Sequence, residues 1–323
     1  MPERASILQG FQLGVETTPG TSVAANKKIT AANLTLGPQV DITKFRPTGY
    51  KFGSLASLNR EWVQGSLSGP LTYTEIVYWL SSLLKSVTPT GTTAYTWTFS
   101  PSTTAADTVK TFTIEQGSST RAHKFTYGLV TGLSMSFSRD GCEIDGTIIG
   151  QDLSDGITLT SSPSTIALVP VTPPQVAVYL ADTQAGLDGA SALTRAISVE
   201  WSITDRFAPV WVLNQATDWA AHVETEPTPR VTLMVQADST GMGLLTTMRA
   251  NSKKFVRIEA TGGTIDGTTN YSLKIDTACQ VTDISDFQDE DGVFAIEWTM
   301  DAIHDTTWGK ATEVTVVNGI SAL

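Results

Sequence analysis

The alternation of apolar and polar residues predicts a chain built mostly from β-strands. Residues 197–204 give the clearest example, because apolar side chains occupy every second position. They are Ile197, Val199, Trp201 and Ile203, with Ser198, Glu200, Ser202 and Thr204 between them. Since alternate side chains of a strand share one face, this pattern indicates a sheet with one buried face. Residues 133–138 and 294–301 alternate similarly, beside Asp140-Gly141 and Asp291-Gly292 pairs that suit tight hairpin turns.

Two segments carry helix signals instead. Thr72-Tyr73-Thr74-Glu75 has the spacing of a capping box, in which a hydroxyl and a carboxylate each satisfy a free backbone N–H. The helix that it opens is predicted over residues 73–85. A second helix is predicted over residues 239–250, with Asp238 or Ser239 as its cap. Each helix is expected to pack against a sheet.

The order of these elements occurs twice along the chain. Sliding the sequence along itself brings apolar positions into register: Ile29 with Ile197, Val63 with Val231, Leu80 with Met248 and, at a shorter offset, Phe112 with Val256. Identity between the halves is low, so the signal lies in element order and apolar pattern. The sequence therefore predicts a mainly β protein with two tandem β-sandwich or barrel domains, each with one short helix packed on its sheet.

The domain boundaries follow from local composition. Residues 1–26 contain many turn-forming residues and are expected to form an irregular arm along the surface. The first β domain is predicted over 27–160 and the second over 175–304. Between them, residues 161–174 are rich in Ser, Thr and Pro, the profile of an extended linker. Residues 305–323 are left as a C-terminal extension.

Each half has a long excursion after its first strand, over residues 37–59 and 205–228. Long loops are uncommon in compact domains, and these hold too much apolar area to be left in water. We expect each to be a flap that docks on a neighbouring subunit; the alternative is a loop folded back on its own domain. The predicted subunit or ring interface comprises Phe45, Tyr50, Phe52, Phe207, Trp211, Leu213 and Trp219.

The net charge of −11 is unevenly distributed. Acidic and basic residues balance over residues 1–165, so all of the excess negative charge lies in residues 166–323. An acidic protein does not attract nucleic acid by counterion release, which disfavours a role in gripping DNA. A surface that DNA must pass without sticking would carry this sign, and so would a protein charged only for solubility. Hydrophobic residues make up 41 % of the chain and charged residues only 16 %.

Cys142 and Cys279 occupy non-equivalent places in the two halves, which predicts two isolated buried thiols. No run of eighteen apolar residues occurs, and residues 1–20 show no basic-then-apolar leader pattern. We therefore expect a protein that neither spans a membrane nor is exported by a cleaved leader.

No catalytic or cofactor-binding pattern stands out. His123, His222 and His304 lack the spacing of a metal pair, and residues 65–69 miss the nucleophile-elbow pattern because Leu67 stands where a serine is needed. Phosphate-binding glycine loops are absent. Clustered carboxylates can hold a calcium ion, but the spacing of Asp283, Asp286, Asp289, Glu290 and Asp291 departs from the EF-hand template and favours a solvated hairpin tip. We expect no enzyme activity, cofactor or metal.

Taken together, these features resemble the major tail tube proteins of long-tailed, siphovirus-type bacteriophages. The resemblance rests on residues 14–21, the flap after the first strand, the helix at 73–85 and the closing hairpin at 125–153. It implies β-sandwich or barrel units that join edge to edge into rings, with the rings stacked into a hollow tube. Members with a duplicated unit form trimeric rings of approximate sixfold symmetry, and the repeat in this chain points to that variety.

The resemblance also implies partners and a location. The protein would assemble with itself and meet the tape measure, tail terminator and baseplate proteins. It would lie in the virion after synthesis in the host cytoplasm, with no membrane contact. Phage DNA would pass through the tube without specific binding. The channel of such tubes is typically negative, which makes Glu143, Asp145, Glu297 and Asp301 the candidate lumen-facing residues.

Two other classes of protein remain as alternatives. A secreted or surface adhesin or carbohydrate-binding protein would share the Thr-rich β composition and expose aromatic residues such as Trp62, Trp79 and Trp97. Such a protein should carry a leader or an anchor. Another virion component, such as a capsid or baseplate protein, would share the location but not the need for a duplicated ring unit.

Overall fold

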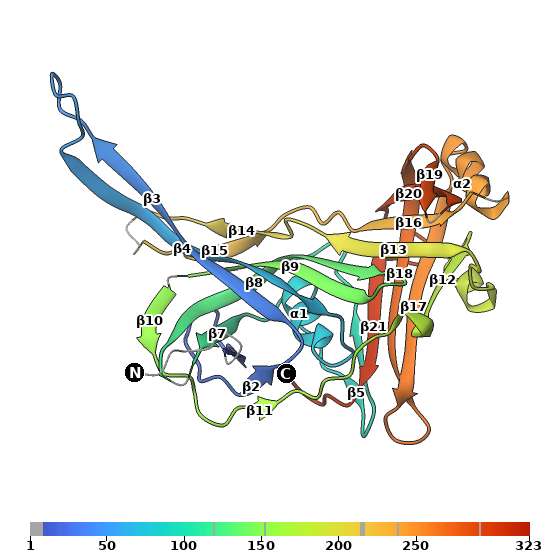
Figure 1. Ribbon diagram of the computed structural model, residues 1–323, viewed down its shortest axis with the longest axis horizontal. Coiled ribbons are helices and arrows are strands. Elements are labelled where there is room, and N and C mark those ends of the chain that lie inside the picture. Colours follow the sequence, from blue (N-terminus) through green and yellow to red (C-terminus); the bar gives the residue numbers. More distant parts are fainter. Residues whose placement is uncertain (1–8, 119, 152, 214–216, 238, 291) are drawn as a thin grey trace.

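The computed structural model describes residues 9–323 except 119, 152, 214–216, 238 and 291. Strands account for 54 % of the chain and helical segments for 8 %, so the predicted mainly β class is confirmed. Figure 1 shows a body of strands from which one long hairpin projects.

The strands up to residue 165 are β1 (Gly10–Val15), β2 (Lys27–Ile29), β3 (Asn33–Phe45), β4 (Leu55–Pro70), β5 (Thr90–Gly91), β6 (Tyr95–Phe99), β7 (Phe112–Gly117), β8 (Ala122–Phe137), β9 (Cys142–Gly150), β10 (Leu153–Ile157) and β11 (Ser164–Thr165). The later strands are β12 (Val176–Ala181), β13 (Ala196–Ile203), β14 (Phe207–Val210), β15 (Ala221–Glu224), β16 (Arg230–Gln236), β17 (Lys253–Thr264), β18 (Asn270–Ile284), β19 (Gln288–Glu290), β20 (Val293–Ala302) and β21 (Thr312–Asn318). The α-helices are α1 (Ile76–Leu83) and α2 (Ser239–Arg249), and short 3₁₀ turns occupy Pro173–Gln175 and Ala185–Gly189.

A single row of antiparallel strands joins the two halves of the chain. We call this row the central sheet, and its order is β3-β4-β9-β8-β13-β16-β20-β18. The junction between the halves is the pair β8 and β13, in which Met135 lies opposite Trp201. Both side chains are fully buried. The alternation predicted at 133–138 and 197–204 therefore forms one continuous buried face.

The core is likewise shared between the halves. One cluster of buried side chains includes Trp79 and Phe112 from the first half and Trp201, Trp298 and Val316 from the second. Helix α1 is buried along its whole length, while α2 is partly buried against the second half. Both predicted helices are confirmed, with α1 beginning three residues later than predicted and ending two residues earlier.

Three segments predicted as peripheral are integral to this core. Residues 10–15 form β1, which pairs with β2 and β7, rather than an irregular arm. In the predicted linker, β11 pairs with β2, and Ile166 and Val171 are buried. The predicted C-terminal extension supplies β21, which lies between β18 and β6 and so ties the halves together a second time. Each segment carries apolar side chains that these sheets bury, which explains the difference.

The capping box at α1 is only half formed. The N–H of Glu75 donates to Thr72 Oγ1 at 3.1 Å, as predicted. The Glu75 carboxylate does not return to the helix cap; it accepts the backbone N–H groups of Thr30, Ala31 and Ala32 at 2.6, 2.9 and 3.2 Å. These three donors belong to the turn that leads into β3, so a buried carboxylate fixes the root of the projecting hairpin.

The pairing order is the same in both halves. The first half pairs in the order β3-β4-β9-β8-β7, and the second in the order β13-β16-β20-β18-β17. Val63 lies opposite Pro38 and Gly150, and Val231 lies opposite Trp201 and Met300. Duplication of one unit stays a prediction, which this shared order supports.

One detail of the predicted register is wrong. Val63 and Val231 do occupy matching places, but the strand residue beside Val63 is Pro38. The counterpart of Trp201 is therefore Pro38, and Ile29 does not match Ile197, because β2 is a separate strand paired with β1. The two excursions differ in length, so a gapless alignment of the halves breaks at this point.

Replacing Glu75 with alanine tests its role at the hairpin root. Glu75→Ala removes the acceptor of the backbone N–H groups of Ala31 and Ala32, which are buried residues, and of Thr30, which is exposed. We expect the free energy of unfolding to fall by about 3 kcal/mol, since each orphaned buried donor costs roughly 1–3 kcal/mol. Urea denaturation measures this loss. Glu143→Ala, on an exposed strand position, is the control and should change stability by less than about 0.5 kcal/mol; equal effects would contradict the assignment.

Candidate functional site

The most prominent surface feature is the hairpin of β3 and β4, which we call the arm (residues 36–62). Cross-strand pairing continues from Asn33 and Ser68 to Phe45 and Leu55, and the arm projects well beyond the body (Figure 1). At its tip, Gly49 has a φ of 82°, which permits the tight reversal. The predicted flap at 37–59 is thus a paired hairpin that extends into solvent.

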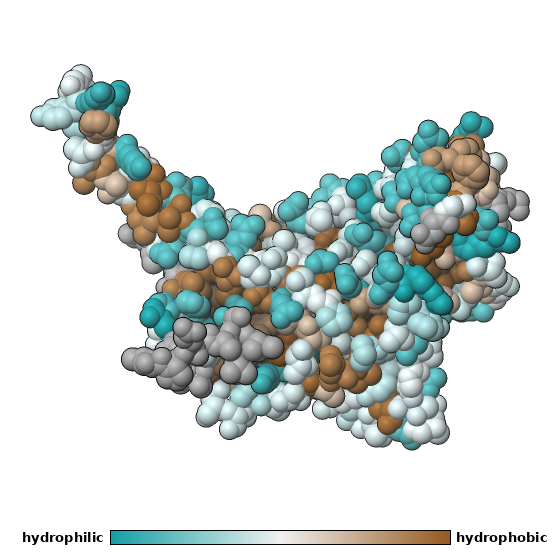
Figure 2. All heavy atoms as spheres, in the orientation of Figure 1, coloured by the Kyte–Doolittle hydropathy of each residue, from teal (hydrophilic) through white to brown (hydrophobic). Residues whose placement is uncertain are grey.

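Apolar side chains are exposed along the whole arm. They are Val40, Ile42, Phe45, Tyr50, Phe52, Leu55 and Leu58, with exposed fractions between 44 and 76 %. Figure 2 shows hydrophobic patches along the arm, with polar residues between them and toward the tip. A free two-stranded hairpin is only marginally stable in water, and contiguous exposed apolar surface marks interaction sites. The predicted interface residues Phe45, Tyr50 and Phe52 therefore lie on an accessible surface.

The second excursion behaves differently. Its strands β14 and β15 pair with each other, and its aromatic residues pack on the first half of the same chain. The Trp219 ring lies 4.1 Å from that of Tyr127, and its Nε1 donates to the carbonyl of Gly150 at 3.1 Å. Phe207 and Trp219 are buried within the chain. The prediction that Phe207 and Trp219 form a subunit interface is therefore wrong, because this part of the second excursion folds back on its own chain.

The other two predicted residues of this excursion lie nearer the surface. Trp211 is half-buried and packs edge-on against Trp62 at the base of the arm, with ring centroids 5.7 Å apart. The guanidinium of Arg60 lies 5.3 Å from the Trp211 ring. Leu213 is almost fully exposed. Trp211 thus braces the arm, while Leu213 is accessible to a partner.

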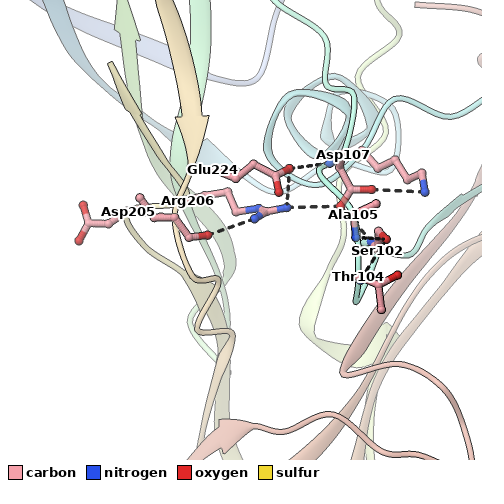
Figure 3. Close-up of polar contacts among 9 residues, drawn as sticks. Ser102, Thr104, Ala105, Asp107, Asp205, Arg206 and Glu224 are labelled. Carbon is pink, nitrogen blue, oxygen red and sulfur yellow. Dashed lines mark hydrogen bonds and ion pairs between the residues drawn. The ribbon is translucent and has the colours of Figure 1, made fainter. Parts of the chain in front are cut away.

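A buried cluster of charges holds the second excursion in place (Figure 3). Arg206 is 2 % exposed, and its Nη2 lies 3.2 Å from Glu224 Oε1 and 3.4 Å from Asp107 Oδ2. Lys85 Nζ, just beyond α1, lies 3.3 Å from Asp107 Oδ1. Two cations thus face two carboxylates drawn from both halves. Because buried charges are tolerated only when paired, this cluster fixes the position of the β14–β15 hairpin. Sequence reasoning did not identify it.

A histidine lies in the same hairpin. His222 Nδ1 is 3.1 Å from the hydroxyl of Tyr127, and the His222 ring meets that of Phe207 edge-on. Burial lowers the pKa of His222 below its usual value, with Glu224 opposing the shift. The neutral imidazole is therefore the form that the fold accommodates. His222 has a packing role between the two halves.

The polar face of the central sheet collects the acidic residues predicted to face a lumen. Directly opposed residues on neighbouring strands point to the same face. One such row crosses the junction between the halves and runs through Asp145, Ser134, Ser202, Arg230 and Asp301. The next row includes Glu143, Ser136 and Glu200.

The fourth predicted carboxylate shares this face. Glu297 lies four residues before Asp301 on β20, and residues an even number apart on a strand point the same way. Glu143 and Asp145 are exposed, and Glu297 and Asp301 are partly exposed. On the opposite face, side chains such as Met135 and Trp201 are buried. All four candidates therefore lie on one water-facing surface.

The structure also places the tryptophans and cysteines that the sequence analysis singled out. Trp79 and Trp97, invoked for a carbohydrate-binding surface, are buried in the core. Cys142 and Cys279 are free and buried, as predicted. Among the described residues, no group of three or more His, Cys, Asp or Glu side chains is arranged to hold a metal ion, and no helix is long and apolar enough to cross a membrane. Asp291 lies outside the described residues.

Comparison with known proteins adds no family assignment. No protein-family model matches the chain, and a search of curated proteins finds no match.

The Arg206 cluster makes a direct prediction about stability. Arg206→Met removes the cation between Asp107 and Glu224, and breaking a buried ion pair costs about 3–5 kcal/mol. We expect chemical denaturation to show a loss of this size. Arg230→Met is the matched control, because Arg230 pairs with Asp301 on the exposed face and such pairs contribute under about 1 kcal/mol. Similar losses in both variants would contradict the assigned role.

His222 predicts a pH dependence between pH 7 and 5. Because its pKa is lowered in the folded protein, the unfolded chain binds more protons in this range, and stability falls as the pH drops below the ordinary value of 6.5. Thermal melts should therefore show a Tm that falls from pH 7 to 5. His222→Gln keeps a polar partner for Tyr127 and should flatten this slope. An unchanged slope in the variant would assign it to other groups.

Proposed function

We propose that this protein is a structural subunit that assembles with copies of itself into the hollow tail tube of a long-tailed bacteriophage. The observation that carries the proposal is the central sheet. It has a polar, acidic face and a buried face, and two strands have an outer edge that is unpaired in the part of the chain that the structure describes. These strands are β3 at one end and, at the other, β19, which pairs with β20 beside the end of β18. Unpaired edges usually invite association, and proteins that do not assemble keep them short or protected.

The arm supports this role independently. A monomer gains nothing from holding Phe45, Tyr50 and Phe52 in water at the end of a long hairpin. In an assembly the same residues would be covered by another subunit, which turns their exposure into a driving force of about 25 cal/mol per Å² of buried apolar area. We propose that the arm reaches from one ring to the next and secures the stack.

The acidic face suits the wall of a channel for DNA. Glu143, Asp145, Glu200, Glu297 and Asp301 all lie on it, with charge partly offset by the ion pair of Arg230 with Asp301. A surface of this sign repels phosphates and offers no counterion release, so DNA would slide without sticking. Of the two explanations for the acidic charge, this distribution favours the channel over general solubility.

The proposal also covers partners and chemistry. Tubes of this kind would end against tail terminator and baseplate proteins, enclose a tape measure protein, and lie in the virion. We propose a structural role without enzyme activity. The adhesin alternative loses its main support, since two of its three tryptophans are core residues and Trp62 packs on Trp211.

Changing the arm tip tests the proposed stacking. Tyr50→Ser combined with Phe52→Ser removes two exposed rings without touching the core, so the monomer should unfold at the same denaturant concentration as wild type. Wild-type protein at high concentration should form hollow tubes in negative-stain electron micrographs, whereas the variant should give only rings or single subunits.

Leu168→Ser provides the control, because Leu168 is also an exposed apolar residue but lies away from the arm, on the segment between β11 and β12. It should form tubes like the wild type. Tubes of normal length from the arm variant would refute the stacking role of the arm, and a wild-type protein that remains a monodisperse monomer at all concentrations would refute the proposed function.

A further inference from the structure

The two strands that correspond to β8 and β13 by the repeat do not pair with each other among the residues that the structure describes. Within the chain, the last residues of β8 pair with β13, from Leu133 opposite Ile203 to Phe137 opposite Val199. If the halves are copies of one unit, the end of the second half should offer the same edge as β8 does. The equivalent of β13 would then be β3, the first strand of the central sheet.

The equivalent of the β8 edge follows from the strand registers. Leu67 lies opposite Gly146 and Val235 opposite Ile296, so β9 and β20 correspond at these positions. Three residues earlier, Glu143 lies opposite Ser136 in β8, and Val293 lies opposite Glu290 in β19. β19 is therefore the counterpart of the end of β8.

The equivalent of β13 follows in the same way. Pro38 lies opposite Val63, and Trp201 lies opposite the matching Val231. Residues 36–40 of β3 thus correspond to residues 199–203 of β13. In the described part of the chain, β3 pairs only with β4 and β19 only with β20, so both edges are free where their counterparts are joined.

Apolar side chains are exposed beside both free edges, that of β19 and that of β3. Phe294 is 73 % exposed and contacts Phe287, which is 56 % exposed. By the registers above, their counterparts in the first half are Ile144 and Leu133, both buried. The second half therefore leaves uncovered the apolar positions that the first half buries beside its junction with β13.

The incoming strand has a matching apolar residue. Val40 is 53 % exposed, whereas its counterpart Ile203 is buried opposite Leu133. Val40 and Phe287 would therefore face each other if the two free edges paired. Burying two large exposed side chains together gives such a pairing a hydrophobic gain in addition to its backbone hydrogen bonds.

We propose that β3 of one copy of this chain adds to β19 of another copy, in the antiparallel register that β13 and β8 use within the chain. Gln39 of one copy then lies opposite Gln288 of the next, as Ser202 lies opposite Ser134. The inference rests on the proposed function, because it needs a second copy as the partner. Its own content is the pair of edges and their register.

The partner has to be a second copy rather than the same chain. Figure 1 places β3 and β19 at opposite ends of the molecule, with the whole central sheet between them. The contact is heterologous, since one copy gives β3 and the other gives β19. Contacts of this kind repeat from copy to copy and close into a ring when the rotation allows.

Cross-linking between two proteins that each carry one introduced cysteine tests the register. Gln39→Cys and Gln288→Cys are prepared in separate full-length chains, mixed, allowed to assemble and oxidised. Directly opposed residues on antiparallel strands have Cα atoms roughly 4.5–5.5 Å apart, within disulfide range. A band at twice the mass of the 34.5 kDa chain is expected. The native Cys142 and Cys279 are buried, and wild-type protein controls for them.

Thr43→Cys mixed with Gln288→Cys is the matched control. Four residues along a strand is a displacement of roughly 13 Å, which is out of disulfide range. Assemblies visible in micrographs without the specific cross-link, or with equal cross-linking in the control, would overturn this seam and leave the proposed function standing. Specific cross-linked dimers without tubes would support the seam and count against the tube. A chain that never associates would overturn both.

Discussion

The antiparallel pairing of β8 with β13 is the contact through which the two halves of this protein act as one body. It places the apolar sides of both halves on one face, where Met135 and Trp201 are buried side by side, and their polar sides on the other. A second contact between the halves comes from β21, at the end of the chain, which pairs with β6 of the first half. A continuous acidic face and two distant free edges follow directly from this geometry.

Buried charge supports that geometry at two points. Glu75 accepts three backbone N–H groups at the root of the arm, and Arg206 joins Asp107 to Glu224 where the β14–β15 hairpin crosses to the first half. In a chain with only 16 % charged residues, these few buried ions are costly unless every one is paired. Glu75 holds the root of the first excursion, which extends into solvent as the arm. Arg206 holds the second excursion, the β14–β15 hairpin, against the first half of the chain.

Strands with clear alternation, such as β8 and β13, could be predicted from the sequence because one buried face imposes a period of two. The capping-box spacing at residues 72–75 located α1, and the length and apolar content of the two long loops located the excursions. These signals could not show that Trp219 packs on Tyr127 while Phe52 stays in water, since both are aromatic residues in loops and only tertiary contacts separate them. Arg206 gave no local signal either, because its partners are distant in sequence. The strand β21 alternates as well, with Val314 and Val316 inward, but it stands alone after the second repeat, so the repeat pattern predicts a terminal extension there.

Hydrogen exchange measured by mass spectrometry on the unassembled and the assembled protein tests the central claim most directly. Amides of β8 and β13 are paired within the chain and should be protected in both states. In residues 36–40 of β3 and in β19, the amides that point away from β4 and β20 should exchange quickly in the single subunit and become protected on assembly; Pro38 has no amide hydrogen. Assembly that leaves both of these edges exchanging as fast as before would contradict the account, because the copies would then be joined elsewhere.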